Sequence, residues 1–260
     1  MKVGLSIASA SFESDPYTGA QSIIERAKEA NQVGLDLLSL GDHHLTPINY
    51  FQNVPMLGRL LAEWQAGPVG CLFLLPLWNP VLVAEQVGTL AALTKATFVI
   101  QTGVGEGEET FKAMGASMKT RGADLEKKIV IIKSLFTKSD SDLQVNPVPT
   151  QKIEWWIGAS TSKEGIRRAA RLGDAWYAAP FLNTSKAGEL LESYLEACEG
   201  LDKKPRPIIR KDVIVLKDEK KAEELGNQLI EKGYRGMQRD AVIVGNPEQA
   251  AEQLRPYKEL

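Results

Sequence analysis

The chain has 260 residues, a length that suits one large domain or two small ones. Apolar residues make up 43% and charged residues 25%, which is close to the average of a soluble globular protein. The 31 Lys and Arg residues nearly balance the 33 Asp and Glu residues, so the charge argues against a nucleic-acid or anionic-membrane partner, because either favours a basic surface.

The cysteines and the N-terminus bear on the compartment. Cys71 and Cys198 are the only two cysteines and show no metal-ligand spacing, which indicates no disulfide framework and a reducing compartment. The segment Met1–Ile7 has one Lys and a short apolar run, so it predicts a first strand rather than a signal peptide. No stretch reaches the roughly 18 to 20 apolar residues of a membrane span. We therefore predict a soluble, cytoplasmic protein.

Short apolar runs alternate with segments of helical period in the first half of the chain. The runs predict strands at Val3–Ala8, Leu35–Leu40, Val69–Leu75 and Thr97–Thr102. Between them, a helical face is predicted at Ile23, Ile24, Ala27 and Ala30. Asn79-Pro80 predicts a helix start, with a capping side chain followed by Pro at the first helical position.

The same alternation continues in the second half. Three further strands are predicted at Ile153–Ile157, Ala175–Ala178 and Ile208–Leu216. A helix is predicted from the spacing of Leu125, Ile129, Ile132 and Phe136. Further helices are predicted at Ser162–Arg171, Thr184–Glu199 and Pro247–Tyr257.

Seven βα repeats predict a parallel sheet covered by helices, closed either as a doubly wound sheet or as a barrel. The turn after the first strand, Ser9-Ala10-Ser11-Phe12, lacks the Gly-x-Gly-x-x-Gly of a dinucleotide fold. Seven repeats also exceed what most open sheets use, so the barrel is favoured. We predict one α/β domain over residues 1–260, a (β/α)8-type TIM barrel. No eighth strand is predicted after Pro247–Tyr257, so the barrel is expected to lack that strand or to have it truncated.

Polar and glycine-rich segments follow most of the predicted strands. In a (β/α) barrel the active site is built from the loops at the carboxyl ends of the strands. Those ends carry Ser9, Gly41–His44, Leu74–Trp78, Gly103–Glu106, Gly158–Ser162 and Ala178–Phe181. We therefore expect these segments to open onto one cleft.

Asp42-His43-His44 is the sharpest of these signals, because His43 and His44 are the only histidines in the chain. A three-histidine zinc site is impossible, and adjacent residues leaving a strand point to opposite sides, so metal binding is disfavoured. Imidazole titrates near neutrality, which suits acid–base work. We predict His43 as the acid–base residue with Asp42 orienting it, and His44 as a pocket residue; the structural alternative is a hydrogen-bonded loop histidine.

The glycine-rich loops each allow two interpretations. Gly158-Ala159-Ser160-Thr161-Ser162 links a strand to a helix, so its backbone N–H groups and hydroxyls suit a phosphate, or Ser160 or Ser162 is an ordinary helix cap. Gly103-Val104-Gly105-Glu106-Gly107 is similar but weaker evidence. Arg121 before a helix either holds phosphate or is exposed. The aromatic residues Phe12, Trp78 and Phe181 either wall an apolar pocket or pack at the edge of the barrel.

Taken in chain order, these segments resemble the bacterial-luciferase-like, flavin-dependent monooxygenase family. The resemblance covers almost the whole chain, and the ordered set is more specific than any one motif. It rests on Ala27-Lys28-Glu29-Ala30, Gly34-Leu35-Asp36, Gly41-Asp42-His43-His44, Leu74–Pro80, Gly103-Val104-Gly105, Arg121-Gly122, Ile157-Gly158, Arg168–Asp174 and Gly245–Gln249.

The resemblance implies an FMN-dependent oxidoreductase, a monooxygenase that uses reduced flavin and O2 on a small organic substrate. It implies that His43 lies beside the flavin ring and that Cys71-Leu72 forms a non-prolyl cis peptide under the ring. The cofactor-binding residues that it implies are Cys71, Leu72, Thr102, Gly103, Gly105, Glu106, Arg121, Gly158, Ala159, Ser160 and Ser162. It also suggests a homodimer.

Two departures from the family pattern leave the phosphate contacts open. Lys95-Ala96-Thr97 stands where the family commonly has Gly-Arg, and an Arg found near Val104 in luciferases is absent. Relatives that use the deazaflavin coenzyme F420 transfer hydride without activating oxygen, and Asp42-His43 and Gly105-Glu106 suit them equally well. A flavin-binding barrel without catalysis is a third alternative.

Overall fold

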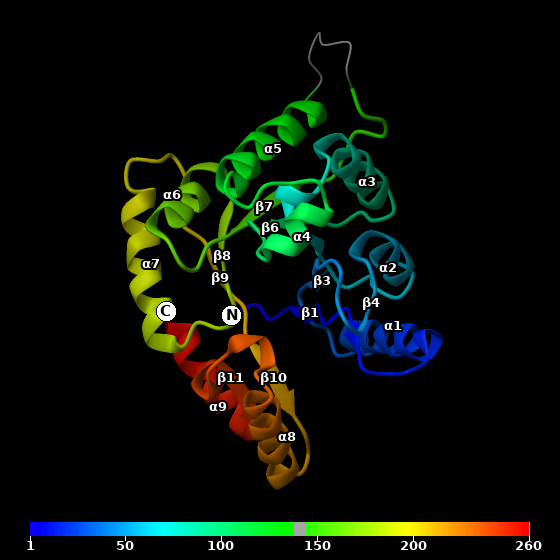
Figure 1. Cartoon of the computed structure of the whole chain (residues 1–260), viewed down its shortest axis with the longest axis vertical. Helices are drawn as coiled ribbons and strands as arrows, with labels where there is room; N and C mark the ends of the chain where they lie inside the picture. The colour runs from blue at the N-terminus through cyan, green and yellow to red at the C-terminus, as the bar shows by residue number, and fades with distance from the viewer. Residues whose placement is uncertain (138–143, 260) are drawn as a thin grey trace. The chain divides into compact units, whose positions relative to one another are not determined.

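The computed structural model describes residues 1–137 and 144–259. The chain divides into two compact units, Met1–Trp156 and Ile157–Leu260, each of which is described by itself (Figure 1). The boundary falls within strand β7 (Ile153–Gly158). Seven of the described strands belong to one sheet with the order β1-β3-β5-β6-β7-β8-β9.

The first unit is built on buried parallel strands. β1 (Leu5–Ile7), β3 (Leu38–Leu40), β5 (Val69–Phe73) and β6 (Phe98–Thr102) pair in parallel in that order. Every residue of β3 and β6 is buried, as expected of a parallel strand that is covered on both faces. Two short antiparallel strands, β2 (Ala10–Ser11) and β4 (Asn49–Tyr50), join the loop after β1 to the loop after β3.

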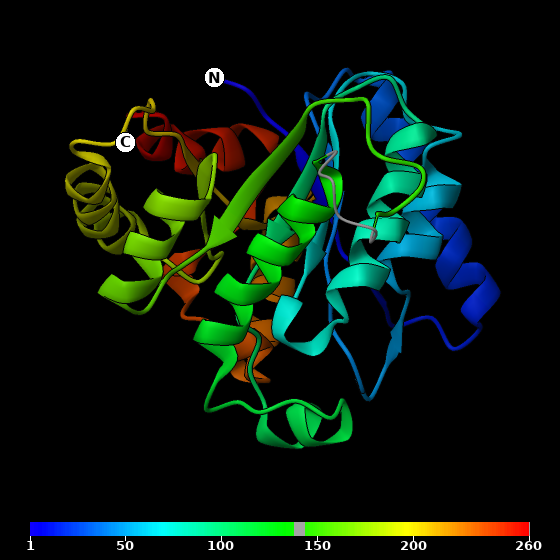
Figure 2. The same ribbon diagram turned by 90° about the horizontal axis from the view of Figure 1, so that it is seen from above.

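Helices cover these strands, and their starts follow from local sequence. α1 (Pro16–Gln32) begins after Asp15, whose carboxylate accepts from the Thr18 backbone N–H at 2.9 Å. α3 (Pro80–Ala92) begins in the same way after Asn79, as predicted. Figure 2 shows α1, α3 and the intervening α2 (Asn53–Leu60), in blue to cyan, along one face of the first unit's strands.

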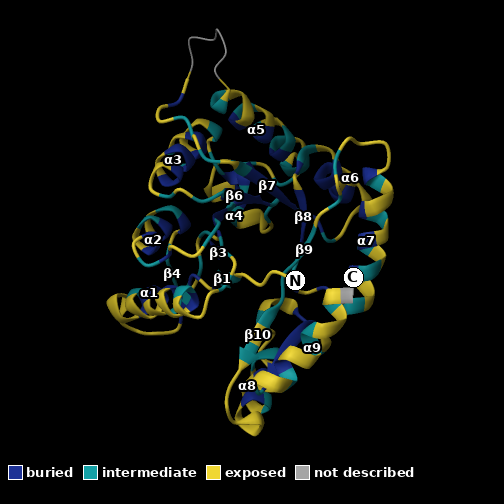
Figure 3. Ribbon diagram, turned by 180° about the vertical axis from the view of Figure 1, so that it is seen from behind, coloured by how far each residue is buried: buried dark blue, intermediate teal, exposed yellow. Residues whose placement is uncertain are grey.

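The remaining elements of the first unit follow β5 and β6. The short 3-10 helix η1 (Leu75–Leu77) comes after β5, and α4 (Glu108–Ala113) and α5 (Arg121–Phe136) come after β6. The predicted inner face of α5 is buried at Leu125, Ile129 and Ile132. In Figure 3 the buried strand β6 is dark blue, while the outer faces of the helices are largely yellow.

The second unit contains two sheet segments. β8 (Ala175–Ala178) pairs in parallel with β9 (Pro207–Ile209), and α6 (Lys163–Leu172) and α7 (Thr184–Cys198) lie between β7 and β9 in the chain. β10 (Asp212–Val215) and β11 (Val242–Gly245) form a separate parallel pair. α8 (Glu219–Glu231) and α9 (Pro247–Glu259) pack on that pair, around a small core of Ala222, Met237, Val242 and Val244.

Two strand predictions for this unit were wrong. The run Ile208–Leu216 is not one strand but two, β9 and β10, which belong to different sheets. The chain turns away at Lys211, whose ammonium donates to the carbonyls of Pro180 (3.1 Å) and Leu182 (2.6 Å). β11 was not predicted. Its four residues lie directly before the helix start at Asn246-Pro247, and only that helix was predicted in this segment.

The α/β fold class is confirmed. Among the described strands, β1 and β9 end a linear seven-strand order, so the parallel sheet is a TIM-barrel variant without closure. Within residues 1–137 and 144–259, no helix is both long enough and apolar enough to cross a membrane.

Candidate functional site

Asp42 lies just beyond β3 and is the most highly connected residue of the predicted site. Its side chain is fully buried. One carboxylate oxygen, Oδ2, accepts from the Leu74 backbone N–H at 2.8 Å and from the Trp78 indole N–H at 2.7 Å. These two bonds tie the end of β3 to the segment that follows β5.

The second oxygen of Asp42 has a different environment. Oδ1 is buried and has no hydrogen-bond partner, and it lies 3.4 Å from Nε2 of His44, which also has none. Burial raises the pKa of the Asp42 carboxyl above its usual value, while the Leu74 N–H, His44, the Trp78 N–H and His43 act in the opposite direction. The carboxyl is therefore a buried group held close to two histidines.

His43 occupies a more open position. The residue is exposed, and its ring meets the Tyr50 ring edge-on with centroids 6.0 Å apart. Its backbone carbonyl accepts from the Gln52 side-chain amide at 3.2 Å. The structure thus brings both histidines close to Asp42, but the imidazole that faces the carboxylate is that of His44.

The predicted aromatic pocket residues separate into two groups. The Trp78 ring lies 5.7 Å from the His44 ring and packs edge-on against Phe73 at 5.3 Å, so Trp78 and His44 form one wall beside Asp42. Phe12, in the same unit, is 81% exposed and lies at the surface. Phe181 belongs to the second unit.

Thr102 ends β6, and the loop that follows holds three more of the predicted cofactor residues, Gly103, Gly105 and Glu106. Gly105 adopts a left-handed φ of 71°, and a Cβ there would lie 3.3 Å from the Phe111 ring, so glycine is required. The Arg121 guanidinium donates to the Gly105 carbonyl at 2.8 Å and fastens this loop to the start of α5. Arg121 is therefore half-buried and engaged, rather than a fully exposed helix-start residue.

Several buried polar atoms near these strand ends have no hydrogen-bond partner. They are the hydroxyls of Ser9, Ser39 and Thr102 and the amide oxygen of Gln101, in addition to the atoms of Asp42 and His44. A buried polar group without a partner costs about 1 to 3 kcal/mol, so such a set calls for a ligand or water to complete it. Ser39 and Gln101 were not predicted, although a polar residue inside an apolar strand was the available signal.

The predicted cis peptide at Cys71-Leu72 was wrong. Among the described residues the cis peptide bond is Asn146–Pro147. Cys71 pairs in register with Leu40 and Ile100, so β5 keeps a regular ladder here and forms no bulge. Cys71 is fully buried, and burial, together with the Asp42 carboxylate, raises the pKa of its thiol well above the usual range.

The second unit holds the remaining predicted cofactor residues, in the turn after β7. Gly158 ends β7, and the carbonyl of the buried Ala159 accepts from the Trp176 indole N–H at 2.7 Å. The Ser160 hydroxyl oxygen accepts from the Ala179 backbone N–H at 2.9 Å, and that of Ser162 caps α6 by accepting from the Gly165 N–H at 3.1 Å. Ser162 is therefore a helix cap, and the hydroxyls of Ser160 and Ser162 can each still donate a hydrogen bond through their O–H.

A cavity of about 540 Å³ opens beside this turn, within the second unit. Asn183 caps α7 by accepting from the Lys186 N–H at 3.0 Å, and its amide donates to Asp240 at 2.8 Å. The cavity thus lies at the starts of two helices, where backbone N–H groups and the helix dipole favour an anion. It is lined by Ser160, Thr161, Phe181, Leu182, Asn183, Lys186, Gln238 and Asp240.

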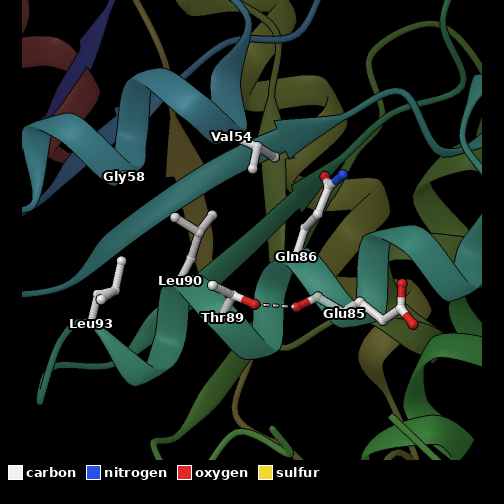
Figure 4. Close-up of a pocket in the computed structure, with 7 residues that line it drawn as sticks. All are labelled: Val54, Gly58, Glu85, Gln86, Thr89, Leu90 and Leu93. Carbon is white, nitrogen blue, oxygen red and sulfur yellow. Dashed lines mark hydrogen bonds between the residues drawn. The ribbon is translucent and has the colours of Figure 1, made fainter. Parts of the chain in front are cut away.

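A second cavity, of about 300 Å³, lies between α2 and α3 of the first unit (Figure 4). Its wall is mostly aliphatic, and its bond between the Thr89 hydroxyl and the Glu85 carbonyl (2.9 Å) lies within α3. None of the predicted site residues lines it, so we do not place the chemistry there. Its lining residues are Val54, Gly58, Glu85, Gln86, Thr89, Leu90 and Leu93.

Comparison with solved structures shows the same fold in known oxygenases. A monooxygenase from Streptomyces bottropensis superposes with a TM-score of 0.83 at 15% identity, over 100% of this chain and 89% of its own. The oxygenating constituent of 3,6-diketocamphane monooxygenase from Pseudomonas putida, solved with FMN, gives 0.78 at 15% identity, over 100% and 88%. These likenesses confirm the fold class.

Sequence comparison gives relatives and a family. An F420-dependent glucose-6-phosphate dehydrogenase of Amycolatopsis mediterranei is 22% identical over 99% of this chain and 89% of its own length. Matches to uncharacterised mycobacterial proteins, at 31% identity, span 39% of this chain and only 38% of those proteins. The family model for luciferase-like monooxygenases matches residues 1–240. The chain therefore belongs to the luciferase-like monooxygenase family.

Proposed function

We propose that the chain is an FMN-dependent oxidoreductase of the monooxygenase type, which acts on a small organic substrate with its proton chemistry at Asp42-His43. The observation that supports this most is the presence of buried, unpartnered polar atoms at Ser9, Ser39, Gln101 and Thr102, on or just after strands β1, β3 and β6. A flavin ring presents both hydrogen-bond donors and acceptors at its edge, so these residues fit it. Reduced FMN, when bound, would supply the electrons for the oxidation by O2.

The residues of the first unit would position the ring and manage protons. Asp42 holds the chain after β5 through the Leu74 and Trp78 N–H groups. His43 is exposed, so its imidazole would be within reach of a substrate and would serve as the acid–base group there. The half-buried Trp78 ring would exclude water from one side of the site.

Each unit also has residues that are proposed to bind cofactor. In the first unit, Gly105 allows the left-handed turn of the loop that follows β6, and Arg121 holds that loop in place. In the second unit, the O–H groups of Ser160 and Ser162 and the start of α6 would bind phosphate. We expect residues 1–260 to act as a single domain, and the protein to form a homodimer in the cytoplasm.

A second candidate keeps the fold and changes the cofactor. The relative that matches 99% of the chain is named as an F420-dependent dehydrogenase, and this favours hydride transfer with coenzyme F420. Glu106, exposed beside Gly105, would suit that cofactor equally well. A flavin-binding barrel without catalysis is the third possibility, because a fold alone does not fix an activity.

Titration with each cofactor distinguishes these candidates. We expect FMN to bind at one site per chain, and bound reduced FMN to be oxidised by O2 when the protein turns over. Tight binding of coenzyme F420 without binding of FMN would establish the second candidate. Bound FMN with no turnover of any organic substrate would support the third.

A further inference from the structure

The carboxylate of Asp42 makes its close approach to His44, the second histidine of the pair. Oδ2 of Asp42 is occupied by two N–H donors, from Leu74 and Trp78. Oδ1 lies 3.4 Å from His44 Nε2, only slightly beyond the usual range of a hydrogen bond. His43 instead presents its ring to Tyr50.

These two facing atoms share an unusual property, because each is buried and neither has another partner. Two lone pairs that face one another in a buried site would repel, whereas one proton between them satisfies both atoms. The side chain of His44 retains 12% exposure, while that of Asp42 has none, so only the histidine has a route for exchanging a proton.

The backbone after His44 supports a specific placement of this side chain. Leu45 adopts a φ of 54°, a left-handed conformation that is uncommon for a residue with a branched side chain. Such conformations persist where the surrounding structure requires them, often at functional sites. The His44 ring, directly before this turn, lies beside Asp42 and also beside Trp78, whose ring centroid is 5.7 Å away.

We propose that Asp42 and His44 form a buried proton-holding pair, in which Asp42 fixes the proton on Nε2 and leaves Nδ1 of His44 as the basic nitrogen. This inference rests on the proposed function and assigns the site a second acid–base residue. Asp42 is then a positioning residue that acts through His44. A substrate proton taken up at Nδ1 would make the imidazolium, and Asp42 would stabilise that charge. Release of the same proton restores the pair.

The other titratable groups that face the pair are few. His43 follows Asp42 directly, and Cys71 on β5 interacts electrostatically with the carboxylate. Neither donates to Oδ1, since that atom has no hydrogen-bond partner. The proton state of His44 should therefore depend on Asp42 more than on either of them.

The chain has only two histidines, so nitrogen NMR can observe each ring separately. Uniformly 15N-labelled protein, without any added cofactor, gives two sets of imidazole signals, which His43→Gln and His44→Gln assign. We expect His44 to show a protonated Nε2 and an unprotonated Nδ1 at neutral pH. Asp42→Asn should change the His44 ring signals and leave those of His43 nearly unchanged.

The controls separate this pairing from a general disturbance. Glu109→Gln removes an exposed carboxylate of the same unit and should alter neither ring. Trp78→Phe keeps an aromatic wall and tests the arrangement if Asp42→Asn fails to fold; it should leave the His44 proton on Nε2. A proton on Nδ1 of His44, or a response of His43 alone to Asp42→Asn, would overturn the proposal.

A kinetic comparison connects the pair to chemistry. With photoreduced FMN as the probe, Asp42→Asn and His44→Gln should change the pH profile of reoxidation by O2 in the same way, and the double variant should add little. Gln keeps a donor near Nε2 but cannot titrate, so rescue of the profile by His44→Gln would show a merely structural role and contradict the proposal. Failure of FMN to bind would count against the proposed function, while the NMR result would still decide the pairing.

Discussion

The turn after β3 and the turn after β7 both follow parallel strands, yet their hydrogen bonding differs. Around Asp42, buried polar atoms remain without partners. In the second unit, the Ser160 and Ser162 hydroxyl oxygens each accept a backbone N–H. The first turn is therefore incomplete without a ligand, while the second is already a finished helix start. Substitutions in the first should change chemistry more than stability, and those in the second should change both.

The largest effect is expected at His43. His43→Ala should lower turnover by roughly 10²-fold or more, the usual scale of general acid–base help, and keep FMN affinity within a few-fold. Steady-state kinetics and FMN titration measure the two quantities. If turnover is unchanged while thermal stability falls, His43 is structural. The turn after β3 would then affect stability more than chemistry, which contradicts the difference drawn between the two turns.

Ser162→Ala and Ser160→Ala test the turn after β7. Each removes an acceptor of a backbone N–H, so we expect each to lower the free energy of unfolding by about 1 kcal/mol and to weaken FMN binding roughly tenfold. Urea unfolding and FMN titration provide the readouts. Thr161→Ala, between them in the same turn, is the matched control. Equal losses in all three variants would show that the turn has no specific contacts.

Asp42→Asn should change stability in a pH-dependent way. Burial raises the pKa of Asp42 in the folded state above 3.8, so this group's contribution to stability is present below that pH and is lost as the pH rises through the folded-state pKa. The Asp42→Asn side chain cannot titrate, so this pH-dependent contribution is absent from the variant.

We therefore expect the stability of Asp42→Asn relative to the wild type to increase as the pH rises from 4 to 8, by on the order of 1 kcal/mol. Urea unfolding between pH 4 and pH 8 measures this difference. The exposed Glu109→Gln should show little pH-dependent difference. A stability difference that does not change with pH would contradict a raised pKa of Asp42 in the folded protein.

The smallest effect is expected at Arg121. Arg121→Met removes the bond to the Gly105 carbonyl but leaves the carbonyl partly accessible to water, so a loss of about 0.5 to 1.5 kcal/mol in unfolding free energy is expected. FMN affinity should fall only a few-fold. A loss of FMN binding of 10²-fold or more would instead make Arg121 a direct phosphate contact.

Local patterns predicted most of the fold. Ala175–Ala178 was predicted to the residue, and Asn79-Pro80 starts α3 as its capping chemistry requires. The division of Ile208–Leu216 was not predictable, because it depends on bonds from Lys211 to carbonyls some 30 residues earlier. The helix α2 was missed, since its eight residues contain Pro and Gly, which disfavour a helix by propensity.

The site was predicted less completely than the fold. Sequence position placed Asp42, His43 and His44 at a strand end, and this holds. It could not say which imidazole faces the carboxylate, because that depends on the local backbone and side-chain conformation, which places His44 Nε2 3.4 Å from Asp42 Oδ1. The cis peptide at Cys71-Leu72 came from resemblance alone, and the regular pairing of β5 overrides it.

The central claim is that a flavin binds at the turn that carries Asp42, His43 and His44. The most direct test adds FMN to the 15N-labelled protein and follows both histidine rings. We predict that the ring signals of His43 and His44 shift and saturate at one equivalent of FMN, while Glu109→Gln behaves as the wild type does. Saturable FMN binding that leaves both histidine rings unchanged would contradict the claim and place the flavin elsewhere.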